Sequence, residues 1–106
     1  MTDIWRSFIA TRLMHLCGYD LVFTGVSAYQ DRNIHNLLRD FADEVPGYLG
    51  NDDIVNALES FELLEGIENI GKNLENVYSS LIKLGYFRVE ELTALKSWLR
   101  DCDNLR

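Results

Sequence analysis

Apolar side chains recur along most of the chain at the three- and four-residue spacing of an α-helix. This spacing predicts helices over residues 3–17, 31–44, 52–64, 67–84 and 89–102. We expect Pro46 to end the second helix, because proline restricts the residue before it and has no backbone N–H to extend the ladder. Gly85 follows the fourth helix, where a left-handed glycine commonly ends a helix. Gly71 lies inside that helix and predicts a close helix crossing.

Residues 19–30 have no firm period. Leu21, Val22 and Phe23 form a short apolar run that Thr24 and Gly25 end. A run this short fits either a strand-like connector or a short helix. We expect a structured connection that packs on the core.

These patterns predict a single helical domain over residues 1–106, with an all-α fold that is a compact bundle of four to five helices. The length of 106 residues suits one domain, and a hydrophobic fraction of 47% supplies one core. In the last helix, Leu92, Leu95, Trp98 and Leu99 are expected to face that core.

The negative charge of the chain is concentrated in its middle. The net charge is −7. Between residues 40 and 75, one base, Lys72, accompanies ten carboxylates: Asp40, Asp43, Glu44, Asp52, Asp53, Glu59, Glu62, Glu65, Glu68 and Glu75. A surface of this sign attracts a basic protein partner and repels nucleic acid, so direct nucleic acid binding is not expected.

The two cysteines, Cys17 and Cys102, lie near opposite ends and predict free thiols. The first residues show no secretory signal, and no stretch is long and apolar enough for a membrane helix. We therefore expect a cytoplasmic location.

Catalytic motifs are missing from the sequence. It contains no glycine-rich phosphate loop, no nucleophile elbow and no paired histidines for zinc. The two imidazoles, His15 and His35, share no ligand spacing with another metal-binding residue. These observations predict a protein that is not an enzyme and that needs no cofactor or metal.

A docking face is predicted on the helix over 52–64. Val55 and Leu63 lie among carboxylates on the side opposite its core stripe, so they offer apolar anchors with charges that orient a partner. The alternative is that both aliphatic side chains are buried. The predicted partner-binding residues are Asp52, Val55, Glu59, Glu62 and Leu63, with Asp40, Asp43 and Glu44 on the preceding helix.

The end of the chain carries the pattern Val77-Tyr78-x-x-Leu81-x-x-x-Gly85-x-Phe87, followed by Leu92-x-x-Leu95-x-x-Trp98-Leu99-x-x-Cys102. This pattern resembles the last two helices of death effector domains. The resemblance implies a six-helix homotypic interaction module. The Arg-x-Asp-Leu signature of that family is not matched, because Asp103-Asn104-Leu105 lacks the arginine.

The charge pattern favours an inhibitor of a cationic protein. The leading hypothesis is a bacterial immunity or antitoxin-type protein, whose carboxylates block the active cleft of a nuclease-like toxin. Three alternatives remain open from the sequence: a phage-type inhibitor that mimics nucleic acid, the homotypic module implied by the resemblance, and a structural subunit whose acidic face keeps it soluble.

Overall fold

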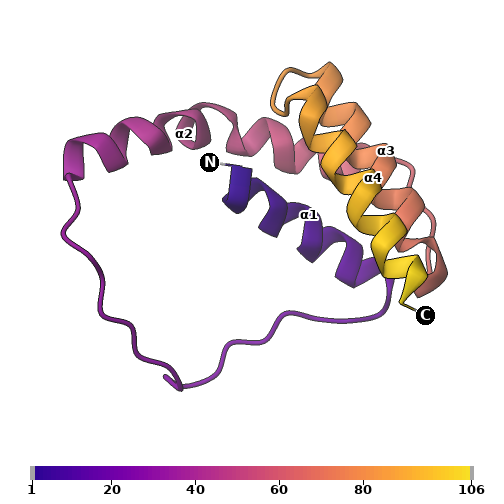
Figure 1. The fold of residues 1–106 in the computed structure, drawn as a ribbon, viewed down its shortest axis with the longest axis horizontal. Helices are drawn as coiled ribbons and strands as arrows, with labels where there is room; N and C mark the ends of the chain where they lie inside the picture. The colour runs from indigo at the N-terminus through magenta and orange to yellow at the C-terminus, as the bar shows by residue number, and fades with distance from the viewer. Residues whose placement is uncertain (1, 106) are drawn as a thin grey trace.

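The computed structural model describes residues 2–105, which form four α-helices and one short 3₁₀ helix, with no strand among them. The elements are α1 (Thr2–Leu16), α2 (Leu37–Ser60), η1 (Ile67–Asn69), α3 (Ile70–Lys83) and α4 (Val89–Asn104) (Figure 1). The predicted all-α bundle is confirmed. The helices predicted over 3–17, 67–84 and 89–102 are also confirmed, to within a few residues at each end.

One hydrophobic core joins the four helices. It contains ten buried apolar residues: Trp5, Ile9, Leu13, Ile54, Leu58, Val77, Tyr78, Leu81, Phe87 and Leu95. Each helix therefore contributes one apolar stripe to the same core. Trp5 is held in two ways, since its ring lies edge-on to Tyr86 at 5.5 Å and its indole N–H donates to Asn51 Oδ1 at 2.9 Å.

Helices α3 and α4 form an antiparallel pair joined by a short turn (Figure 1). Gly85 in this turn has a φ of 88°, as its position after the helix predicts. The backbone N–H groups of Tyr86 and Phe87 donate to the carbonyl of Leu81 at 3.0 and 3.4 Å. The helix end is therefore satisfied by the turn that follows it.

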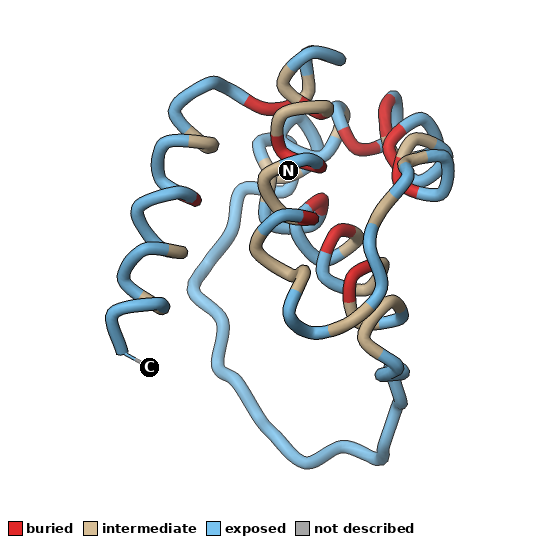
Figure 2. The backbone as a smooth tube through the Cα atoms, turned by 90° about the vertical axis from the view of Figure 1, so that its right-hand side faces the viewer, coloured by how far each residue is buried: buried red, intermediate tan, exposed pale blue. Residues whose placement is uncertain are grey.

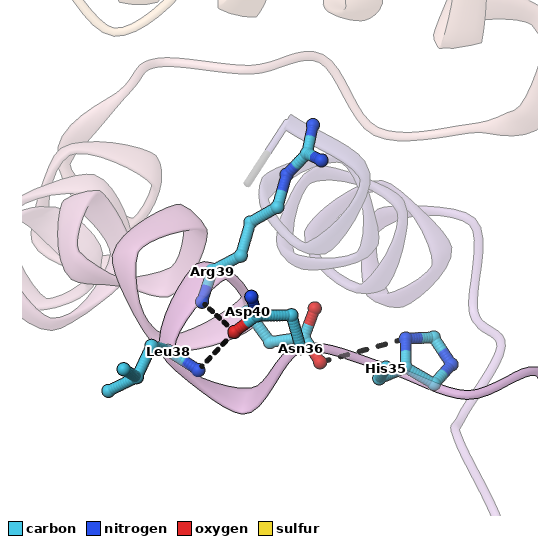
Figure 3. A network of polar contacts seen from close by, with 5 residues as sticks. All are labelled: His35, Asn36, Leu38, Arg39 and Asp40. Carbon is cyan, nitrogen blue, oxygen red and sulfur yellow. Dashed lines mark hydrogen bonds and ion pairs between the residues drawn. The ribbon is translucent and has the colours of Figure 1, made fainter.

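The prediction of two separate helices over 31–44 and 52–64 is wrong, because α2 is one helix of 24 residues that continues through Pro46. It begins after Asn36, whose Oδ1 accepts from the backbone N–H groups of Leu38 and Arg39 at 3.1 and 3.2 Å (Figure 3). The stretch Gly50-Asn51, which lies between the two predicted helices, stays helical because Gly50 is buried against Tyr86 and Asn51 binds Trp5. Tertiary contacts override the local signal.

The prediction that residues 19–30 pack on the core is also wrong. All residues from 19 to 36 are exposed and have neither helix nor strand structure (Figure 2). Phe23 is 90% exposed and Val26 is 99% exposed. Without a regular period the apolar side chains share no face that a neighbouring helix can cover, and the segment forms a wide loop between α1 and α2 (Figure 1).

Candidate functional site in the groove between α1 and α4

A groove runs between α1 and α4. Helix α3 packs against both of these helices and forms the base of the groove, while α1 and α4 stand on either side. Its volume is about 520 Å³. The lining residues are Arg6, Ala10, Leu13, Met14, Cys17, Tyr19, Ile67, Ile70, Leu74, Tyr78, Glu91, Ala94, Leu95 and Trp98.

The groove has a rigid apolar floor and an aromatic rim. Leu13, Tyr78 and Leu95 belong to the buried core, so the positions of their side chains are fixed by packing. Trp98 is 56% exposed and lies at the rim. The sequence pattern placed Trp98 in the core, and that prediction is wrong, because its side chain lines the open groove between α1 and α4 and remains half exposed.

Arg6 and Glu91 supply a charged pair in the lining. Arg6 Nη2 on α1 donates to Glu91 Oε2 on α4, so the pair bridges the two sides. This hydrogen bond raises the pKa of the Arg6 guanidinium, and the phenol of Tyr78 adds to the effect. Both side chains remain partly exposed, at 49% and 27%, and keep hydrogen-bonding capacity for a ligand.

Size and lining together are typical of a small-molecule site. Such sites are concave and mostly apolar, with a few polar groups that fix the orientation of the ligand, and their volumes run from about 300 to 1,000 Å³. The groove meets each of these conditions. Among residues 2–105, no group of three or more histidine, cysteine, aspartate or glutamate side chains is placed to hold a metal ion.

The predicted docking residues lie elsewhere. Asp40, Asp43, Glu44, Asp52, Val55 and Glu59 are on α2, whereas Glu62 and Leu63 follow its end at Ser60. Val55 is 38% exposed, but Leu63 packs against the core. The stripe Val55-Glu59-Leu63 is therefore not one continuous helical face.

Sequence reasoning missed the groove. Arg6 and Glu91 are 85 positions apart, and nothing in the spacing of either residue predicts that they meet. An aromatic residue at a helical core position, such as Trp98, gives the same signal whether it is buried or lies at a rim.

The whole chain, residues 1–106, matches the family model of STELLO glycosyltransferases. The chain belongs to the STELLO glycosyltransferase family. No curated protein and no solved structure matches it.

Membership in the STELLO family corrects the functional predictions made from the sequence. The immunity or antitoxin hypothesis and the expectation that the protein is not an enzyme are wrong, since the family is one of glycosyltransferases. The phage-type inhibitor and the homotypic module are set aside for the same reason. Charge indicates which partners a surface attracts, but it does not indicate the reaction of a protein.

Three predictions from the sequence stay predictions: the docking face, the basic protein partner and the cytoplasmic location. In the part of the chain that the structure describes, no helix has the length and hydropathy to cross a membrane.

Proposed function

We propose that this STELLO-family chain serves glycosyl transfer by binding a neutral acceptor sugar in the groove between α1 and α4. The observation that carries the proposal is the pairing of an exposed indole, Trp98, with a polar pair, Arg6 and Glu91, over an apolar floor. A sugar ring needs both kinds of contact. Its C–H face is apolar, whereas its hydroxyl groups donate and accept hydrogen bonds.

Each group has a defined role in this proposal. The indole of Trp98 stacks against the C–H face of the sugar and offers a large rigid surface. The guanidinium of Arg6 donates to sugar hydroxyl oxygens, and the carboxylate of Glu91 accepts from sugar hydroxyl groups. Because each charge keeps its partner in the pair, the ligand needs no charge of its own.

The same electrostatics disfavour a sugar nucleotide in this groove. A nucleoside diphosphate carries negative charge that cationic side chains must balance. Among the described residues that line the groove, Arg6 has the one cationic side chain, and that side chain is already paired with Glu91. The chain as a whole is negative at −7. The groove therefore fits the acceptor of the reaction better than its donor.

Titration calorimetry with neutral oligosaccharides of different sugars, and with UDP-glucose as a charged donor, tests the proposal. At least one neutral oligosaccharide should bind. UDP-glucose should bind no more tightly than a neutral oligosaccharide of glucose. Trp98→Ala should weaken binding by about five- to tenfold, since an aromatic stacking contact of this kind contributes about 1–1.5 kcal/mol.

Tyr48→Ala is the matched control, because Tyr48 is a similarly exposed aromatic residue on α2, outside the groove. It should leave sugar affinity unchanged. Preferred binding of UDP-glucose, or equal losses in the two variants, would contradict the proposal.

A further inference from the structure

Helix α2 has a second apolar face that nothing in the described chain covers. Its inner face is buried at Gly47, Gly50, Ile54 and Leu58. The other face, here called the outer face of α2, consists of Leu37, Leu38, Phe41, Tyr48 and Leu49. At about 100° per residue, Leu37, Phe41 and Tyr48 lie within about 40° of one another, and their common direction is turned by about 115° around the helix axis from the inner face. A surface helix normally has one apolar stripe.

The exposure of the outer face is large. Leu37 and Leu38 are 80% and 81% exposed, and Leu49 is 79% exposed. The rings of Phe41 and Tyr48 lie 6.0 Å apart and form one aromatic surface. Contiguous exposed apolar surface of this kind marks a binding site more often than scattered single residues do.

The accessible surface of the molecule is larger than that of a compact monomer, as expected when part of the surface binds a partner. The accessible surface is 8502 Å². A monomer of 12.2 kDa is expected to expose about 6,100 Å², so the excess is about 2,400 Å². A standard protein interface covers about 800 Å² on each partner. The outer face of α2 and the exposed segment 19–36 together hold 12 of the 20 large hydrophobic residues that are exposed in the described chain.

A depression beside the outer face gives a partner a place to insert. It has a volume of about 620 Å³ and lies between the first turns of α1 and α2. Ile4, Leu37 and Phe41 supply its apolar surface. Its acidic groups are Asp3, Asp40, Asp43 and Glu44.

Two bases, Arg32 and His35, also line the depression. His35 Nδ1 lies 3.6 Å from Asp40 Oδ2 (Figure 3). The carboxylates outnumber these bases, so the depression is acidic.

Charge decides which occupant fits. Helix α2 carries six carboxylates against one base, Arg39. Two copies that met through their outer faces would bring like charges together, which disfavours a dimer. An anionic membrane surface is disfavoured for the same reason. A helix with leucine or aromatic anchors and lysine or arginine at its edges meets both the apolar and the acidic parts of the surface.

We propose that the outer face of α2 and its adjacent depression bind a cationic amphipathic helix of a protein partner. This surface is separate from the sugar groove, since the two sites share no lining residue. The proposal therefore does not depend on the proposed function.

A pair of designed peptides tests the proposal. The probes are an 18-residue amphipathic helix of leucine and lysine and its counterpart of leucine and glutamate, each labelled for fluorescence anisotropy. The lysine peptide should bind and the glutamate peptide should not. Glu44→Lys and Phe41→Ala should each weaken binding by about tenfold or more, because one reverses the charge and the other removes an anchor.

Glu65→Lys is the matched control, because Glu65 is an exposed carboxylate outside the depression. It should change affinity by less than about twofold, since rim charges far from a contact contribute little. If Glu44→Lys and Glu65→Lys weakened binding equally, the peptide would be bound by non-specific charge attraction, and the proposal would be overturned.

Light scattering supplies a second decisive measurement. A chain that is monomeric at micromolar concentration supports the proposal. A dimer that Phe41→Ala converts to a monomer would overturn it, because the outer face would then belong to a second copy. Circular dichroism of each variant shows whether it is folded, and exposed substitutions should leave the melting curve within about 0.5 kcal/mol of the original stability.

Discussion

At the scale of single residues, Asn73 shows how one polar side chain fixes a loop. It is 2% exposed. Its Oδ1 accepts from the backbone N–H of Leu64 at 3.0 Å, and its Nδ2 donates to the carbonyl of Leu64 at 2.7 Å. Asn73 thereby pairs both backbone groups of a residue in the segment between α2 and η1. Helical periodicity assigns no role to such a residue, because the bond depends on a loop that the pattern does not place.

Replacing Asn73 by alanine should lower the free energy of unfolding by about 1–3 kcal/mol, since both backbone groups of Leu64 lose their partner. Urea denaturation measures this change. Asn76→Ala is the control on the same helix, where an exposed side chain should contribute no more than about 0.5 kcal/mol. Equal losses in the two variants would show that the bonds to Leu64 contribute nothing.

The phenol of Tyr86 should make the stability of the fold depend on pH in the alkaline range. Desolvation raises the pKa of its phenol above 10.0, and the hydrogen bond to Asp53 Oδ2 at 3.1 Å adds to the shift. The folded state thus holds this proton more tightly than the unfolded state does. Stability should be unaffected by Tyr86 below about pH 10 and should fall as pH rises through the folded-state pKa. Tyr86→Phe should make that fall less steep in melts between pH 9 and about 11. An unchanged slope would contradict this assignment.

At the scale of elements, Gly71 in α3 and Gly85 in the turn after it differ in whether the structure requires glycine at that position. Gly85 has a φ of 88°, a conformation that costs other residues about 1–2 kcal/mol. Gly71 was expected to mark a close crossing, but an added Cβ would meet Leu99 of α4 at an ordinary 3.8 Å. The crossing therefore does not require glycine, and that prediction is wrong.

The two alanine variants should change stability in opposite directions. Gly85→Ala should lower the free energy of unfolding by about 1–2 kcal/mol, because nothing lies within 4 Å of an added Cβ and the strain lies in the backbone alone. Gly71→Ala should raise it by about 0.5–1 kcal/mol, since glycine inside a helix is entropically costly. Thermal melts of both variants test the pair. A stabilised Gly85→Ala protein would contradict the turn geometry.

A helix can be predicted from the sequence when local residues determine its ends, and not when contacts distant in sequence determine them. The helices α1, α3 and α4 have clear apolar stripes, and Gly85 gives a stop signal after α3, so their predicted bounds are close to the observed ones. Helix α2 combines two local signals that both fail: Pro46 did not end it, and Gly50 did not begin a loop. Contacts of Gly50 and Asn51 with residues distant in sequence keep this stretch helical.

At the scale of the whole molecule, a bundle of helices carries a long projecting loop and an uncovered helix. The radius of gyration is 15.9 Å, whereas a fully compact chain of this length would have about 13 Å. The negative net charge can be read from the sequence, but the groove cannot, because Arg6, Glu91 and Trp98 line one groove only after three helices pack. Fold class can thus be predicted from periodicity here, while the site cannot.

The exposed loop should be the first place that a protease cuts. The segment 19–36 contains one tryptic site, Arg32, and all of its residues are exposed. Limited trypsin digestion with mass spectrometry should therefore give a first cut after Arg32, because extended exposed backbone fits a protease site. Arg32→Gln should remove this cut and leave the helices intact. A first cut within α3 or α4 would show that the bundle opens before the loop is reached.

The proposed function depends on the groove between α1 and α4 being a sugar site. Chemical-shift mapping by NMR, with a neutral oligosaccharide that binds in calorimetry, tests this most directly. The indole N–H of Trp98 and the side-chain signal of Arg6 should shift on titration, while the signals of Tyr48 and Leu49 on α2 stay in place. Shifts confined to α2 or to the segment 19–36, with Trp98 and Arg6 unmoved at saturation, would contradict the assignment of the groove.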